Sequence, residues 1–157
     1  MSRPQFHLAQ INVADMLYPI EHEGMAEFVA RLDAVNALAD GAPGFVWRLQ
    51  DTAGDATAIR AFVDNQILIN MSVWESVEAL FDFTYKSGHA EVFRRRKDWF
   101  EMPREAHLAL WWVPRGHLPD TQEGQERLVR LREHGPSELA FTLKQRFEPA
   151  AAQSRNA

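Results

Sequence analysis

Cysteine is absent from this chain of 157 residues. Its absence excludes disulfides and thiolate-held metals, and removes any need for an oxidising compartment. Long apolar runs are also lacking: the longest is Leu108–Val113, whereas a membrane-spanning helix needs about 20 apolar residues. The first residues have no apolar segment of the length that a signal peptide contains. We therefore expect a cytoplasmic protein without a membrane partner.

Positive charge is in deficit. The sequence has 17 Lys and Arg against 22 Asp and Glu, which gives a net charge of −5 and a pI near 5.7. Domains that bind nucleic acids are usually basic overall. We therefore expect no nucleic-acid partner, and the basic run Arg94–Lys97 must act locally.

Several catalytic motifs are missing as well. The chain contains no GxGxxG element, no P-loop and no GxSxG elbow, which argues against phosphate cofactors and serine-hydrolase chemistry. Neither HxH nor HExxH spacing occurs, so we expect no metal site.

What the chain does contain is enough apolar material for one core, with 46% hydrophobic and 11% aromatic residues. A single domain over residues 1–148 is expected, followed by a disordered tail over 149–157. Alternating apolar residues predict strands at 5–13, 44–51, 66–74 and 107–113, and helical spacing predicts helices at 25–40, from 77, from 88 to about 100, and 121–134. Residues 140–143 suggest a short edge strand.

The order of these elements is β-α-β-β-α-α-β, with an appended helix and a short strand. A β-α-β-β-α-β core is the ferredoxin-like motif of the α+β class, with an antiparallel sheet and helices on one face. Ser76 and Thr121 are expected to be N-caps, and Gly135-Pro136 ends the last helix.

The second face of this sheet needs a cover. Strand alternation places Trp111 and Trp112 on opposite faces, so one of them must point away from the helices. A bare tryptophan surface is typical of an interface or a ligand cavity. The simplest cover is a second copy of the sheet, which predicts a two-fold homodimer.

The segment 86–100 combines a histidine with basic and aromatic residues. On a helical wheel the apolar residues of this segment lie on one face and form a stripe, whereas Arg94, Arg95 and Lys97 lie on the side that faces solvent. The stripe contains His89, Val92, Phe93, Arg96, Trp99 and Phe100. Within it, His89 is either a general acid or base, or a haem ligand, or a neutral histidine bonded to a backbone carbonyl. Arg96 is either an anion or carbonyl clamp, or an arginine that packs its alkyl stem.

Several segments also resemble a family of uncharacterised bacterial proteins. They are GFVWRLQD, LINMSVWESVEAL, HAEVFRRRKDWFE and LWWVPRGHLP, with the later HGP and AFT, and the resemblance spans residues 5–149. That family belongs to the dimeric α+β barrel superfamily, whose best-known members are the antibiotic biosynthesis monooxygenases. The resemblance implies a ferredoxin-like protomer, a homodimer packed through its sheets, and a pocket between sheet and helices.

Within that superfamily the pocket hosts cofactor-free oxidation, haem degradation, peroxidase chemistry or isomerisation, so the resemblance locates a site rather than a reaction. Our first hypothesis is a cofactor-independent, monooxygenase-like enzyme that acts on an aromatic or apolar small metabolite. The second is a non-catalytic small-ligand-binding or dimerisation module, and the third is a haem-binding protein with His89 as ligand.

For the enzyme, the candidate catalytic residues are His89, Asn70 and Arg96. Amide and indole N–H groups can stabilise a developing oxyanion, although Asn70 and Ser72 are as well explained as polar residues that hold strands in register. The candidate substrate-binding residues are Trp74, Trp111, Trp112, Ser72, Tyr85, Arg48 and Asn12.

Overall fold

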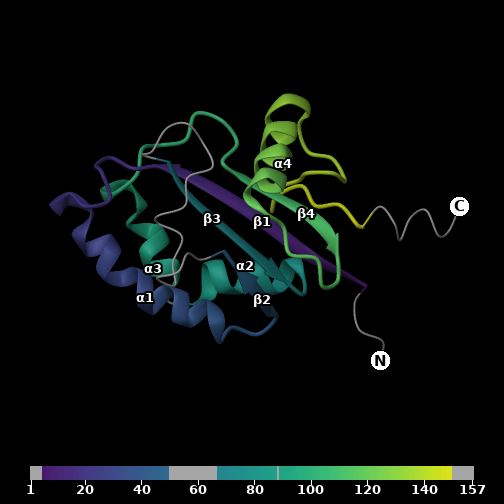
Figure 1. Ribbon diagram of the computed structural model, residues 1–157, viewed down its shortest axis with the longest axis horizontal. Helices are drawn as coiled ribbons and strands as arrows, with labels where there is room; N and C mark the ends of the chain where they lie inside the picture. Colours follow the sequence, from purple (N-terminus) through teal and green to yellow (C-terminus); the bar gives the residue numbers. More distant parts are fainter. Residues whose placement is uncertain (1–4, 50–66, 88, 150–157) are drawn as a thin grey trace, which may run out of the picture.

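The computed structural model describes residues 5–49, 67–87 and 89–149. Its centre is an antiparallel sheet with the strand order β2-β3-β1-β4 (Figure 1). The strands are β1 (Phe6–Asp15), β2 (Phe45–Arg48), β3 (Ile67–Trp74) and β4 (Leu108–Pro114). This is the ferredoxin-like order, so the predicted α+β fold is confirmed. Of the predicted tail, residues 150–157 lie outside the described ranges.

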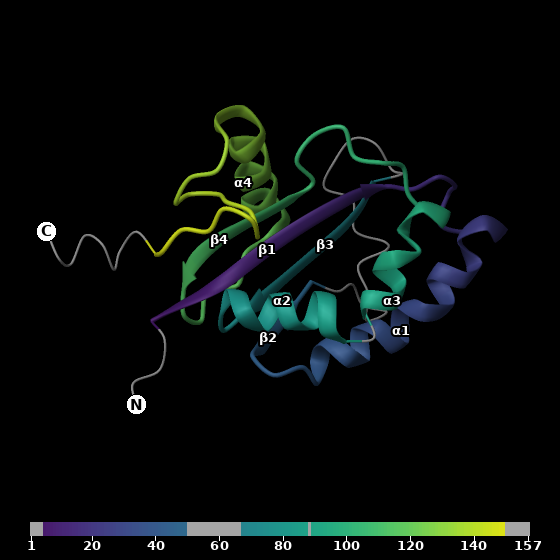
Figure 2. The same cartoon turned by 180° about the vertical axis from the view of Figure 1, so that it is seen from behind.

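The helices lie on both sides of this sheet. They are α1 (Ala26–Asp40), α2 (Val77–Lys86), α3 (His89–Arg94) and α4 (Thr121–His134), with short 3₁₀ turns at Glu23–Met25 and Arg96–Asp98. Helices α1, α2 and α3 lie on one face, and α4 lies on the other (Figures 1 and 2). Within the described ranges, no helix is both long and apolar enough to cross a membrane.

The cover on the second face differs from the expectation. Trp111 is fully buried in a core cluster that includes Leu128 and Leu131 of α4. Gly124 brings the helix close, because a Cβ at this position would lie 2.9 Å from Ile11 Cδ1 and 3.0 Å from Met71 Cε. The prediction of a bare tryptophan face is therefore wrong: the appended helix folds back over it.

Two N-caps fix the starts of α2 and α4. Ser76 accepts a hydrogen bond from the backbone N–H of Ala79 at 3.1 Å, which confirms the predicted cap. Helix α4 is capped by Asp120, whose carboxylate accepts from the N–H of Glu123 at 2.8 Å. Thr121 is instead the first helical residue, so its prediction is corrected; aspartate ranks with the strongest N-caps, ahead of threonine.

The helix after residue 88 is shorter than predicted, because α3 ends at Arg94 and a 3₁₀ turn follows. A 3₁₀ turn has three residues per turn rather than 3.6, so side chains beyond it point in new directions. Arg95 turns toward the core and lies over the Trp99 ring, 5.0 Å from its centroid. Arg96 is exposed, so its predicted inward orientation is wrong.

Residues 140–143 form two isolated bridges instead of an edge strand, Phe141 with Leu110 of β4 and Ala140 with Ser137. Phe141 and Leu110 exchange both backbone hydrogen bonds, at 2.9 and 2.8 Å. The Phe141 side chain is buried on the same side of the sheet as Leu8 and Trp74. The C-terminal segment is thus attached to β4 at one residue rather than along a strand.

Candidate functional site

A group of polar side chains lies on the sheet face that α1, α2 and α3 cover. It comprises Gln10 and Asn12 of β1 and Asn70 and Ser72 of β3, and we call it the amide network. The two central strands pair Gln10 with Ser72 and Asn12 with Asn70. Because cross-strand partners point to the same face, strand register alone brings all four side chains together.

Hydrogen bonds connect the whole network. Gln10 Nε2 donates to Asn70 Oδ1 at 2.7 Å and to Ser72 Oγ at 2.8 Å. Asn12 Nδ2 donates to Gln10 Oε1 at 3.1 Å and to Asn70 Oδ1 at 3.2 Å. The Trp74 indole Nε1 donates to Ser72 Oγ at 2.8 Å, so Ser72 links the network to a buried tryptophan.

Burial changes along the network. Gln10 and Ser72 are only 2% and 7% exposed, Asn12 is half-buried and Asn70 is exposed. The Asn70 carbonyl already accepts two hydrogen bonds, whereas its Nδ2 has no hydrogen-bond partner among the described residues. The network therefore runs from the interior to the surface and ends in an amide N–H group that is available to a ligand.

Aromatic rings lie behind this polar surface. The Trp74 ring is buried and contacts Phe45 and Phe83, at centroid distances of 5.4 and 5.2 Å. Phe83 in turn contacts the ring of His89 at 5.1 Å. Because Trp74 is buried and uses its N–H internally, its place in this structure is to support Ser72 rather than to form an open ligand wall.

His89 lies at the start of α3 and is half-buried. Its Nδ1 lies 3.3 Å from the carbonyl oxygen of Thr84, and Nδ1 must carry the proton to donate there. Burial lowers the pKa of His89 below its usual value, and the bond to Thr84 partly opposes this shift. The lowered pKa favours the neutral ring, and the bond to Thr84 places its proton on Nδ1, so the lone pair that a base or a metal ligand requires is on Nε2.

The structure brings together only part of the predicted site. Arg48 aligns with Ser72 across β2 and β3, and its guanidinium bonds Asp40 of α1 at 2.8 Å. Tyr85 is 44% exposed and packs against Phe81 at 4.7 Å. Of these two, only Arg48 is aligned with the amide network.

Three predicted residues lie elsewhere or are occupied. Trp111 is on the opposite face, where its indole bonds Glu123 at 2.8 Å. Trp112 shares the face of the network, but its indole donates to the Phe147 carbonyl at 2.7 Å. Arg96 bonds the Phe93 carbonyl at 2.9 Å and lies over that ring, so it is no inward clamp.

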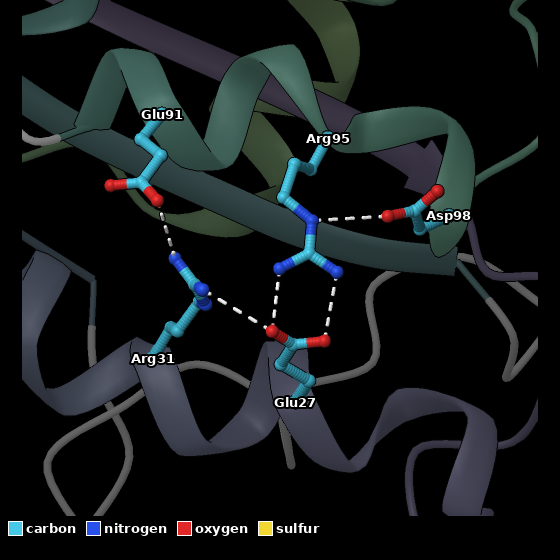
Figure 3. A network of polar contacts seen from close by, with 5 residues as sticks. All are labelled: Glu27, Arg31, Glu91, Arg95 and Asp98. Carbon is cyan, nitrogen blue, oxygen red and sulfur yellow. Dashed lines mark hydrogen bonds and ion pairs between the residues drawn. The ribbon is translucent and has the colours of Figure 1, made fainter.

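The sequence interpretation missed an ionic network between α1 and α3 (Figure 3). Both terminal nitrogens of Arg95 bond the Glu27 carboxylate, at 2.5 and 2.8 Å, while its Nε bonds Asp98 at 3.1 Å. Arg31 adds bonds to Glu27 and Glu91 at 3.2 and 3.4 Å. Hydrogen bonding to Arg95, aided by Arg31, lowers the pKa of Glu27 to about 2.

This network links two helices and is not a second candidate site, because each of its charged groups has an oppositely charged partner within the network. Arg95 was expected in solvent on the assumption that the helix continues to Phe100. The sequence does contain a signal for this network: Glu27 lies in the first turn of one predicted helix, and the basic run Arg94–Lys97 lies in another. The sequence alone, however, does not show that these two helices are neighbours.

Two surface depressions lie along α4; neither is lined by a residue of the amide network, although Trp112 lines the first. The first has a volume of about 660 Å³ and is lined by His117, Glu123 and Arg127, among others. The second, of about 400 Å³, is lined by residues of α4 alone, including Val129 and His134. Among the described residues, no three histidine or acidic side chains are grouped as metal ligands would be.

Comparison with known proteins gives a family and several structural neighbours. No curated protein matches this chain. The chain resembles SnoaB, a cofactor-independent oxygenase from Streptomyces nogalater, at 17% identity over 73% of this chain and 98% of SnoaB, with a TM-score of 0.49. A protein of unknown function from Nitrosomonas europaea aligns at 12% identity over 74% of this chain and 97% of its own, with a TM-score of 0.46.

The family match extends over nearly the whole chain. The model of a domain of unknown function, DUF3291, matches residues 7–157. The prediction of an uncharacterised family is thereby confirmed. This chain belongs to the DUF3291 family.

Proposed function

We propose that this protein is a cofactor-independent, monooxygenase-like enzyme that acts on an aromatic or apolar small metabolite. The ligand would bind between the sheet and helices α1, α2 and α3, at the exposed end of the amide network. The observation that carries the proposal is Asn70, an exposed amide on a central strand whose carbonyl is held from behind by Gln10 and Asn12.

The chemistry of this position suits an electron-rich substrate. Oxidation without a cofactor needs a deprotonated substrate that reacts with dioxygen directly, so negative charge has to be stabilised on a substrate oxygen. Fixed neutral N–H donors stabilise such charge without first having to reorganise. The outward Nδ2 of Asn70 is a donor of this kind, because its carbonyl is already occupied.

A base is also required to remove the substrate proton. His89 is the candidate, since its Nδ1 is engaged by Thr84 and its pKa is lowered by burial, which leaves a neutral Nε2 at pH 7. Its ring packs against Phe83, which packs against Trp74, the residue whose indole donates to Ser72. A general base of this type contributes about 10²–10⁴-fold in rate.

The test is oxygen consumption with a panel of hydroxylated polycyclic aromatics and no added cofactor. Turnover is expected in the wild-type protein, with a loss of at least about tenfold in Asn70→Ala and in His89→Ala. His134→Ala, at an exposed histidine of α4, is the matched control. Turnover that persists unchanged in both site variants would overturn the assignment.

One observation agrees with the haem alternative, namely the orientation of the His89 ring, but the surroundings of that ring do not. In a histidine that ligates a metal, the N–H of the other ring nitrogen usually donates a hydrogen bond to a carbonyl or carboxylate. The Nδ1–H of His89 has this orientation toward the Thr84 carbonyl. The ring lies between Phe83 and Phe93, however, at 5.1 and 6.4 Å, and neither depression along α4 includes His89. The surroundings therefore do not fit a haem plane, and added hemin should produce no Soret shift that His89→Ala abolishes.

The non-catalytic alternative is a small-ligand-binding or dimerisation module, and in its dimerisation form the amide network has a purely structural role, in which it holds β1 and β3 in register. In that case Asn70→Ala would lower the stability of the fold without changing the affinity for any small molecule. Native mass spectrometry of the purified protein distinguishes this structural case from ligand binding, because a ligand-binding protein is expected to retain a small apolar ligand that Asn70→Ala loses, whereas turnover distinguishes an enzyme from a non-catalytic ligand-binding module.

A further inference from the structure

We infer that Gln10 is a positioning residue that couples the amide orientations of Asn12 and Asn70. Through this coupling, the two asparagines together present one hydrogen-bond donor and one acceptor to a ligand. The inference rests on the proposed function for the location of the ligand, but the coupling itself is a property of the protein alone.

The position of Gln10 is the first argument. Its side chain is 2% exposed, and its amide is hydrogen-bonded at both ends, through Nε2 to Asn70 and Ser72 and through Oε1 to Asn12. Every other member of the network bonds Gln10 directly. A buried amide with this many partners has no solvent to compensate a lost bond, so its orientation determines that of its neighbours.

The donor and acceptor assignments follow from these contacts. With Gln10 Nε2 toward β3, Asn70 must turn its carbonyl inward and its Nδ2 outward. Asn12 must then turn Nδ2 inward to reach Gln10 Oε1 and Asn70 Oδ1, which leaves Asn12 Oδ1 outward. The outward surface therefore carries an N–H donor from Asn70 and a carbonyl acceptor from Asn12.

A second arrangement satisfies the same contacts. If all three amides turn over together, Gln10 Oε1 accepts from Asn70 Nδ2 and from the Ser72 hydroxyl, and Gln10 Nε2 donates to Asn12 Oδ1. The outward donor is then on Asn12 and the acceptor on Asn70. Turning one amide alone would place two donors or two acceptors 2.7 to 3.2 Å apart, so the amides turn only as a set.

This coupling specifies the chemistry of the ligand. Both arrangements offer one donor and one acceptor side by side, and neither offers two of a kind. The matching ligand carries an acceptor oxygen, such as a carbonyl or phenolate, together with a hydroxyl or amine donor on an apolar frame. A ligand with acceptors only would leave one asparagine carbonyl without a partner.

The direct test is NMR of the asparagine side-chain amides in the ligand-free protein, assigned by Asn12→Asp and Asn70→Asp. In the wild-type protein one of the two NH₂ groups should be protected from exchange with water and the other should exchange fast. In Gln10→Met, which keeps a similar volume but removes the amide, that contrast should be lost. A contrast that survives in Gln10→Met would overturn the inference.

The second test uses 4-nitrophenol as a probe, because its ionisation is visible by absorbance. The outward N–H donor of the wild-type protein should lower the apparent pKa of the bound probe. Gln10→Glu offers only acceptors, so Asn70 should turn its NH₂ group inward at the expense of its 3.2 Å bond with Asn12, and the apparent pKa of the bound probe should rise. Gln10→Met should abolish the shift, and Gln145→Glu, which adds the same charge at an exposed position, should retain it.

The two proposals fail in distinguishable ways. A wild-type protein that binds no probe and consumes no oxygen contradicts the proposed function. In that case the difference in exchange rate between the two asparagine NH₂ groups still tests the coupling. A wild-type protein that binds the probe, with an ionisation shift unchanged in Gln10→Met, contradicts the coupling alone.

Discussion

Ser72 shows how one hydroxyl can hold a buried site together. Its oxygen accepts from Trp74 Nε1 and Gln10 Nε2, and both donors are almost completely buried. Removing the hydroxyl leaves these donors without a partner, which costs about 1–3 kcal/mol. We expect Ser72→Ala to lower the free energy of unfolding by this amount.

Urea denaturation followed by tryptophan fluorescence measures the loss. Asn70→Ala is the comparison, because Asn70 is exposed and its removal leaves groups that water can reach. Its cost should be clearly smaller than that of Ser72→Ala. Equal costs would show that the network does not depend on burial.

His89 gives a prediction for the dependence of stability on pH. Burial lowers its pKa in the folded protein, so the unfolded chain binds a proton at a higher pH than the folded one does. The contribution of neutral His89 to the free energy of unfolding is therefore fully present above the ordinary histidine pKa of about 6.5. It is lost as the pH falls through the lower pKa that His89 has in the folded protein. His7 and His107 are shifted in the same direction, mainly by burial.

We expect the free energy of unfolding to decrease as the pH falls below the ordinary histidine pKa of about 6.5, and His89→Gln to make that decrease shallower. Glutamine retains an N–H donor for the Thr84 carbonyl but does not titrate. His134→Gln, at an exposed position, should leave the slope unchanged. An unchanged slope in His89→Gln would mean that His89 is not neutralised by folding.

At the level of single residues, the sequence was sufficient where strand alternation decides orientation. It placed Asn70, Ser72 and Trp74 on one face, and the structure agrees. It failed at Arg96, because the change from α-helix to 3₁₀ turn after Arg94 depends on tertiary contacts. The acidic partner that draws Arg95 inward lies 68 residues away in the chain.

Between elements, the Glu27–Arg95 pair joins α1 to the junction between α3 and the following 3₁₀ turn (Figure 3). The lowered pKa of Glu27, about 2, means that this carboxylate is stabilised in the folded state relative to its usual value of 4.5. The stabilisation is present above the usual value and is lost as the pH falls toward 2. We expect Glu27→Gln to reduce stability at pH 7 and to have little effect near pH 2.

Thermal unfolding at both pH values tests this prediction. Glu91→Gln is the control, since Glu91 has a single bond of 3.4 Å to Arg31 in the same network and should matter less. Because the charges are accessible to solvent, 1 M salt should also narrow the difference at pH 7. A difference that persists at pH 2 would assign the effect to packing instead.

Helix α4 depends on a close approach to the sheet at Gly124. A Cβ there would lie 2.9 to 3.1 Å from atoms of Ile11 and Met71, so a larger side chain must push the helix outward. We expect Gly124→Leu to lower the free energy of unfolding by about 1–3 kcal/mol, as measured by chemical denaturation. Arg130→Leu, at an exposed position of the same helix, should cost much less.

For the elements, the sequence predicted the strands and the start of α2 well, because alternation and capping are local signals. It did not predict that Asp120 replaces Thr121 as the cap, since both residues are capable of the role and stand side by side. Nor did it indicate which face α4 covers, because Leu128 and Leu131 show only that the helix has an apolar side.

For the whole molecule, the oligomeric state remains a proposal. We propose a homodimer through the part of the second sheet face nearest β2, where Val46, Trp47 and Leu49 are only partly buried at the margin of the core that α4 covers. Light scattering should give twice the chain mass of 18.0 kDa. Trp47→Glu should give the monomer, and Leu139→Glu, at an exposed position away from β2, should not.

The architecture as a whole followed from the order of the elements, because few sheet topologies accept β-α-β-β-α-β. The site followed only in part. Register brings Asn12 and Gln10 beside Asn70 and Ser72, whereas Trp111 lies on the other face and the Trp112 indole is bonded to the Phe147 carbonyl. A carbonyl 35 residues away leaves no periodic signal in the sequence.

The bridge between Phe141 and Leu110 has a consequence for how copies of this protein behave at high concentration. An outer strand with unoccupied N–H and C=O groups is a template on which a strand of another chain can assemble into an aggregate. At Leu110, in the middle of β4, both outward backbone groups are bonded to Phe141. We therefore expect the C-terminal segment to hinder the pairing of β4 with a strand of another chain at this position.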